Sequence, residues 1–134
     1  METLDEHIRS SRRTGTIEFF IEERDEKHVI SRMPITPGIL NPLGTVQAGA
    51  LIWLADVTAS TLVVEGKNLD ENGKGFPLAI DIHTALVSNQ RKGEIRAEAR
   101  FVRKGRRVSV VRTRILGAND ELLAEVTSTH VPAE

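Results

Sequence analysis

Apolar and polar residues alternate in several short segments of the chain, and this spacing predicts β-strands. The clearest segment is 94–102, where Ile95, Ala97 and Phe101 fall on one side and charged residues fall on the other. Similar spacing and flanking turn residues predict further strands at 16–21, 28–33, 78–86, 107–116 and 122–131. Segments 94–102 and 107–116 follow each other through Lys104-Gly105, so we expect a tight hairpin between them.

One long segment, 47–65, has the composition of a helix instead. Its apolar residues point in every direction, and Gly66 follows as a C-terminal cap. Such a helix must be wrapped, and the order strand, strand, helix, four strands predicts an α+β fold with an antiparallel sheet curled around it. A second copy of the chain is the simplest cover for any open face. We expect one domain over 1–134, with 1–13 forming a short N-terminal helix or tail.

The composition excludes several kinds of chemistry. The 134 residues include no cysteine, so there is no disulfide framework, thiolate nucleophile or cysteine-based metal site. The net charge of −1 is a cancellation, because segment 91–114 has ten basic and two acidic residues (+8) and the other residues have 8 basic and 17 acidic (−9). No secretory signal precedes the first strand, and the apolar run 48–64 is short for a membrane span, so we expect a cytoplasmic protein.

Asp56 stands out because it lies in the middle of the apolar helix, where a carboxylate is costly to bury. One interpretation is structural: the carboxylate bonds Ser60 one turn on, or faces a subunit contact. The other is a catalytic base or nucleophile for acyl transfer or hydrolysis. Gly44 and Gly49 flank the helix start, where free backbone N–H groups could stabilise an oxyanion.

The run from Asn41 to Asp56, Asn-x-x-Gly-Thr-Val-Gln-Ala-Gly-x₅-Ala-Asp, resembles the signature of hotdog-fold acyl-CoA thioesterases. The nearest branch is the phenylacetate-degradation type, within the 4-hydroxybenzoyl-CoA thioesterase-like superfamily. The hairpin at 103–108 and the turn and strand at 117–124 are also similar to this family. The resemblance covers roughly residues 14–131 and implies the hotdog fold, a curved antiparallel sheet wrapped around one long helix.

The resemblance also implies roles for individual residues. Asp56 matches the catalytic carboxylate and Ser60 a position that assists it, while Ala48 matches the residue whose N–H faces the thioester carbonyl and Asn41 a polar residue that positions water or that carbonyl. The basic hairpin matches the region near the CoA phosphates, which implies binding by Arg103, Lys104, Gly105 and Arg106. Gln47-Ala48 replaces the usual His-Gly, and Gln47 cannot take up a proton at neutral pH.

We therefore predict a thioesterase that hydrolyses a small or medium acyl-CoA, aromatic acyl groups included, to the free acid and CoA. CoA is part of the substrate, and we expect no separate cofactor, no metal, no nucleic acid and no membrane partner. Family sites lie at a dimer interface, which implies a homodimer or a dimer of dimers. Alternatives are a hotdog protein that binds acyl thioesters without hydrolysis, one that catalyses another acyl-CoA reaction, and a basic interaction module. The four histidines lack metal-ligand spacing and are expected to be structural or surface residues.

Overall fold

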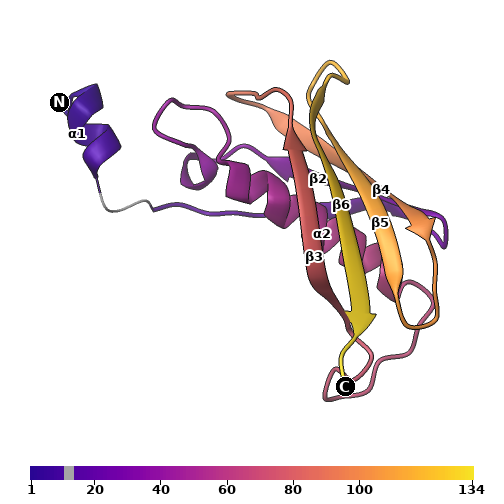
Figure 1. The fold of residues 1–134 in the computed structure, drawn as a ribbon. Helices are drawn as coiled ribbons and strands as arrows, with labels where there is room; N and C mark the ends of the chain where they lie inside the picture. Colours follow the sequence, from indigo (N-terminus) through magenta and orange to yellow (C-terminus); the bar gives the residue numbers. More distant parts are fainter. Residues whose placement is uncertain (11–13) are drawn as a thin grey trace.

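The computed structural model describes residues 1–10 and 14–134, and its main feature is one antiparallel sheet beside one long helix (Figure 1). The six strands are arranged in the order β1-β2-β4-β5-β6-β3. Their bounds are β1 Phe20–Arg24, β2 His28–Pro34, β3 Pro77–Leu86, β4 Glu94–Arg103, β5 Ser109–Leu116 and β6 Leu122–Pro132. The helices are α1 Leu4–Arg9, the short 3₁₀ turn η1 Pro37–Ile39 and α2 Ala48–Val64. The predicted α+β architecture is confirmed.

The core lies between the concave face of the sheet and α2, which contacts β2, β3, β4, β5 and β6. Ile95, Ala97 and Ala99 of β4 are fully buried there, as their alternation predicts. Gln47 is the N-cap of α2, and Gly66 follows the C-cap with a φ of 76°, a conformation that glycine adopts without strain. None of the helices in the described residues is long and apolar enough to cross a membrane.

The helix is covered by its own chain on one side only. Fully buried side chains repeat at helical spacing along the side that faces the sheet: Ala50, Leu51, Leu54, Ala55, Thr58, Ala59, Leu62 and Val63. The opposite side is only partly buried and carries Ile52, Trp53, Asp56, Val57, Ser60, Thr61 and Val64. A single curved sheet covers one side of α2 and leaves this opposite side open.

The first strand does not lie where the alternation predicts it. The alternation predicts it at 16–21, but β1 is Phe20–Arg24. The preceding segment is held by the loop after β2 instead, where the Thr36 hydroxyl donates to the Thr16 carbonyl. Gly15 and Gly38 also approach so closely that a Cβ on Gly15 would lie 2.5 Å from the Gly38 nitrogen. Loose alternation cannot reveal such a contact.

The expectation for 1–13 falls partly outside the described residues; α1 forms within it and buries no residue.

The β4–β5 hairpin is also less tight than predicted. β4 ends at Arg103 and β5 begins at Ser109, so a loop of residues 104–108 replaces the expected short turn. The register shifts between Phe101 and Arg103, and the Ser109 hydroxyl donates to the Gly105 carbonyl (3.2 Å). A Cβ on Gly105 would collide with the Val108 carbonyl oxygen, so this loop requires glycine there.

β3 is an edge strand with exposed apolar side chains. Leu78, Ile80 and Ile82 are 48%, 62% and 41% exposed. In the part of the chain that the structure describes, the strand pairs only with β6, and the register shifts between Ala79 and Asp81. Its outer edge therefore leaves backbone N–H and C=O groups without a neighbouring strand.

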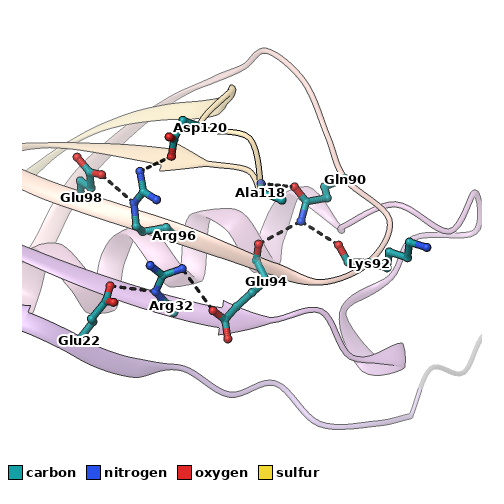
Figure 2. A network of polar contacts seen from close by, with 9 residues as sticks. All are labelled: Glu22, Arg32, Gln90, Lys92, Glu94, Arg96, Glu98, Ala118 and Asp120. Atoms are coloured by element: carbon teal, nitrogen blue, oxygen red, sulfur yellow. Dashed lines mark hydrogen bonds and ion pairs between the residues drawn. The ribbon is translucent and has the colours of Figure 1, made fainter.

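Polar side chains brace the end of the sheet that lies near the start of α2 (Figure 2). Arg96 joins Glu98 (2.9 Å) to Asp120 (2.8 Å). The Gln90 amide donates to two carbonyl oxygens near the start of β4 and accepts from the Ala118 N–H (2.9 Å). These contacts tie the β3–β4 connection to the β5–β6 turn.

Candidate active site

Asp56 lines an open groove beside α2 with a volume of about 330 Å³. The walls are mostly apolar: Phe19, Val57, Val64, Phe76, Pro77 and Leu78, together with Ala79 and the hydroxyl residues Ser60 and Thr61. One carboxylate oxygen, Oδ1, is buried and has no hydrogen-bond partner in the described part of the chain. A charged oxygen in that position is costly unless a ligand or another chain satisfies it.

Ser60 lies in the same groove one turn after Asp56. Within residues 1–10 and 14–134 no hydrogen bond joins the two side chains, so the structural interpretation in which Ser60 satisfies the carboxylate does not apply to this chain alone. The structure therefore leaves Ser60 beside the carboxylate with its hydroxyl available to a bound molecule.

The N-terminus of α2 is uncapped by any side chain. Gln47 is exposed, its backbone N–H donates to the Ile39 carbonyl (2.8 Å), and its carbonyl accepts from the Ala50 N–H (2.9 Å). The next two backbone N–H groups, those of Ala48 and Gly49, have no acceptor among the described residues. A Cβ built on Gly49 meets nothing within 4 Å, so the approach to these donors is open. They carry the positive end of the helix dipole.

The side chain of Asn41 is used within its own loop. Its amide nitrogen donates to the Thr45 hydroxyl (2.7 Å), and its oxygen accepts from the N–H groups of Leu43 (2.9 Å) and Thr45 (3.1 Å). Asn41 thus shapes the loop that leads into α2. The guanidinium of Arg91 supports the same loop by donating to the Leu43 carbonyl (2.6 Å).

The basic hairpin lies at the other end of α2. Arg103, Lys104 and Arg106 are exposed, and Lys104 Nζ lies 5.6 Å from the centroid of the Phe101 ring. The loop adjoins the last turn of α2, the α2–β3 connection and the C-terminal residues (Figure 1). None of these three cations has an ion-pair partner in the described residues, so they are available to an anion.

The predicted site residues therefore occupy three regions. Asp56 and Ser60 share the groove, the basic hairpin lies near the C-terminal end of α2, and Gln47, Ala48 and Asn41 lie at its N-terminal end. Ala48 precedes Asp56 by eight residues, which corresponds to about 12 Å along a helix axis. Within one chain, the carboxylate and the free N–H groups are therefore too far apart to contact the same thioester group.

His130 near the end of β6 is a residue that the motif analysis did not single out. It is 1% exposed, its Nε2 lies 2.8 Å from the Ser128 hydroxyl, and its Nδ1 is buried without a partner among the described residues. Burial lowers the pKa of His130, and the charge of Asp56 partly opposes that shift. The alternation in β6 is the signal that could have placed it, because Val126, Ser128 and His130 share the inward side.

No group of three or more histidine or acidic side chains in the described residues is placed to hold a metal ion. The groups that can act on a bound molecule are therefore a carboxylate, free backbone N–H donors, hydroxyls and exposed cations.

Comparison of the sequence with protein-family models and with curated proteins finds no match. Solved structures are similar. A variant of thioesterase enzyme SAV0944 from Staphylococcus aureus has a TM-score of 0.78 at 22% identity, over 87% of this chain and 93% of that chain. Thioesterase HI1161 from Haemophilus influenzae has a TM-score of 0.76 at 22% identity, over 87% and 78%. A putative esterase, Rv1847, from Mycobacterium tuberculosis has a TM-score of 0.78 at 18% identity, over 87% and 91%.

The chain therefore has the hotdog fold, as the motif resemblance implies. Identities near 20% establish the fold, and the activity has to be argued from the site of this chain.

Proposed function

We propose that this protein is an acyl-CoA thioesterase that hydrolyses a small or medium acyl-CoA, with Asp56 as the general base or nucleophile. The observation that carries the proposal is the buried, unpartnered Oδ1 of Asp56 in an otherwise apolar groove. A structural carboxylate at such a position normally has a hydrogen-bond partner. A reactive carboxylate is kept free for its substrate.

The chemistry needs few groups because a thioester is already activated toward attack. As a general base, Asp56 takes a proton from water while the water oxygen attacks the carbonyl carbon; the C–S bond then breaks, and the proton passes to the CoA sulfur. As a nucleophile, Asp56 itself attacks that carbon and expels the CoA thiolate, and water then hydrolyses the resulting anhydride. Both routes yield the free acid and CoA, and both need an oxyanion site.

The free N–H groups of Ala48 and Gly49 supply that oxyanion site. Since they lie about 12 Å along the axis from Asp56 in their own chain, we propose that the site is completed by a second copy, as the family resemblance implies. Two features support a dimer: the unpaired, apolar edge of β3 and the partly open face of α2. Pairing of two β3 edges would satisfy the edge groups.

The basic hairpin supplies the site for the CoA phosphates. Arginine suits phosphate because its guanidinium makes two parallel hydrogen bonds. Arg103 is exposed at the end of β4, and Lys104 and Arg106 are exposed on the loop that follows, which bends sharply at Gly105. The reacting thioester would then lie in the groove and the nucleotide end on the surface.

A panel of acyl-CoA esters with straight-chain, branched and aromatic acyl groups tests the proposal, with a thiol-detecting dye as readout. We expect thiol release that depends on Asp56: Asp56→Asn should reduce turnover by at least a thousandfold. Thr61→Ala, at the neighbouring wall of the same groove, is the matched control and should retain most of the activity. Absence of release across the panel would refute hydrolysis.

A second function is favoured by one residue. Gln47 takes the position where the family that this sequence resembles has histidine. Its side chain cannot exchange a proton at neutral pH. If a histidine were needed there, the protein would bind acyl thioesters without cleaving them. Calorimetric titration with acyl-CoA, done beside the release assay, separates the two functions.

A further inference from the structure

Two buried polar atoms without partners lie on facing elements next to the groove. They are Oδ1 of Asp56 on α2 and Nδ1 of His130 on β6. Asp56 and Ala79 of β3 line the same groove, and Ala79 is the direct neighbour of His130 across the β3–β6 pair. His130 therefore lies one strand away from the wall of the groove that holds Asp56, on the buried side of β6.

The surroundings of His130 determine which of its nitrogens is free. Nε2 is engaged with the Ser128 hydroxyl at 2.8 Å. The strand neighbours Ala79 and Ser109 carry no charge. On its other side, a cavity of about 10 Å³ is also lined by three exposed cations, Lys67, Arg106 and Arg107. Among the described residues, Asp56 is the only acidic group that acts on His130.

We propose that His130 is a positioning residue for Asp56: its neutral ring accepts a hydrogen bond from the Ser128 hydroxyl at Nε2 and presents Nδ1–H to the buried Oδ1 of Asp56. Burial keeps the ring neutral, because it lowers the pKa of His130. The two atoms are not within hydrogen-bond distance in this structure, and catalytic hydrogen bonds often shorten only when substrate is bound. The shortened bond would hold one carboxylate oxygen and leave the other for the groove.

The role of His130 as a positioning residue rests on the proposed hydrolysis. Which ring nitrogen of His130 carries the proton can be measured whether or not the protein hydrolyses a thioester. Nitrogen-15 NMR of the neutral ring at pH 8 distinguishes the Nδ1–H from the Nε2–H form. We expect Nδ1–H in the unaltered protein and a shift toward Nε2–H in Asp56→Leu, whose side chain has no hydrogen-bond acceptor. An Nε2–H ring in the unaltered protein, or a tautomer that Asp56→Leu leaves unchanged, would overturn the inference even if the enzyme is active.

Two substitutions separate a positioning role from a structural one. The amide nitrogen of asparagine can occupy the position of Nδ1, and that of glutamine the position of Nε2. His130→Asn should therefore keep most of kcat, while His130→Gln should lose about ten- to a hundredfold in kcat with little change in KM, which is what one hydrogen bond to a charged group is worth.

If His130 serves only to bond Ser128, the order of the two variants is reversed, and that result would contradict the proposal. His28→Asn, on a partly buried, ion-paired histidine of β2, controls for histidine loss in general. If the unaltered protein hydrolyses no ester in the panel, the proposed function fails, and the tautomer measurement still decides the placement of the proton.

Discussion

The side-chain amide of Asn89 makes a reciprocal pair of hydrogen bonds with the backbone of Val46. Its oxygen accepts from the Val46 N–H (3.1 Å), and its nitrogen donates to the Val46 carbonyl (2.9 Å). Val46 is two residues before Ala48, whose free N–H begins α2. The clamp therefore fixes the orientation of the peptide groups that would form the oxyanion site.

Loss of this clamp should loosen the start of α2. We expect Asn89→Ala to speed amide hydrogen exchange at Val46 and Gln47, to reduce kcat more than it raises KM, and to lower the free energy of unfolding by about 1 kcal/mol. Asn119→Ala, an exposed asparagine whose side chain makes no hydrogen bond to the described residues, is the control. Unchanged exchange at Val46 would show that the loop is held by other contacts.

Asp56 should reduce stability while it serves function. Before substrate binds, its enclosed oxygen is within hydrogen-bond distance of no group in the described residues, so replacement by an apolar side chain of similar size relieves the cost of its lost hydration. We expect Asp56→Leu to raise the free energy of unfolding by about 1–2 kcal/mol and to abolish turnover. Ser60→Ala, one turn on in the same groove, should leave stability nearly unchanged. A loss of stability in Asp56→Leu would mean that the carboxylate has a stabilising partner.

Much of the fold is predictable from the sequence because local pattern determines it. β4 alternates strictly, and its inward residues Ile95, Ala97 and Ala99 are fully buried, although Phe101 is only partly buried. α2 begins and ends within a residue of its predicted bounds. The errors lie where contacts outside the alternation decide the path of the chain. The segment before β1 is held near Thr16 by the distant loop at Thr36, and the β4–β5 loop is bent by a local contact between Gly105 and Val108.

The candidate site divides in the same way. Asp56 can be recognised as a candidate from the sequence alone, because it is a carboxylate in the middle of an apolar helix. His130 and Asn89 acquire their roles only from strand pairing and from contacts between segments more than forty residues apart. Local composition carries no signal for such contacts.

His130 also makes the stability depend on pH. Its pKa is lowered from 6.5, chiefly by burial. The unfolded chain therefore binds the proton more readily, so the contribution of the neutral ring is complete above about pH 6.5 and is lost as the pH falls toward the lower, folded-state pKa. Between the folded-state pKa of His130 and about pH 6.5, the free energy of unfolding of the unaltered protein should rise with pH by up to about 1.4 kcal/mol per pH unit because of this group. His130→Asn should lack that contribution. Denaturant titrations of His130→Asn and of the unaltered protein at pH 5 to 8 measure the difference. Parallel curves for the two proteins would contradict this account.

The open edge of β3 predicts a dimer that charge can break. Lysines at Ile80 and Ile82 would put two like charges on each edge as the two copies approach. We expect the double substitution Ile80→Lys, Ile82→Lys to convert the dimer to a monomer in light scattering at a fixed concentration, and to abolish turnover with it. Val102→Lys, also at an exposed apolar residue but on β4, should remain dimeric. A monomeric unaltered protein with full activity would refute the shared site.

The basic hairpin should act on the nucleotide end of the substrate and not on the thioester. Arg103→Glu and Arg106→Glu place a negative charge where the CoA phosphates are proposed to bind, so KM for acyl-CoA should rise about tenfold or more, with kcat nearly constant. An N-acetylcysteamine ester of the same acyl group has no phosphates, and its kinetics should be unaffected. Added salt should raise KM for the CoA ester in the unaltered protein and much less in the variants.

Arg114→Glu, on an exposed arginine of β5 outside this loop, is the matched control. If the variants weaken both esters equally, or if the control weakens acyl-CoA binding as much as they do, the phosphates bind elsewhere.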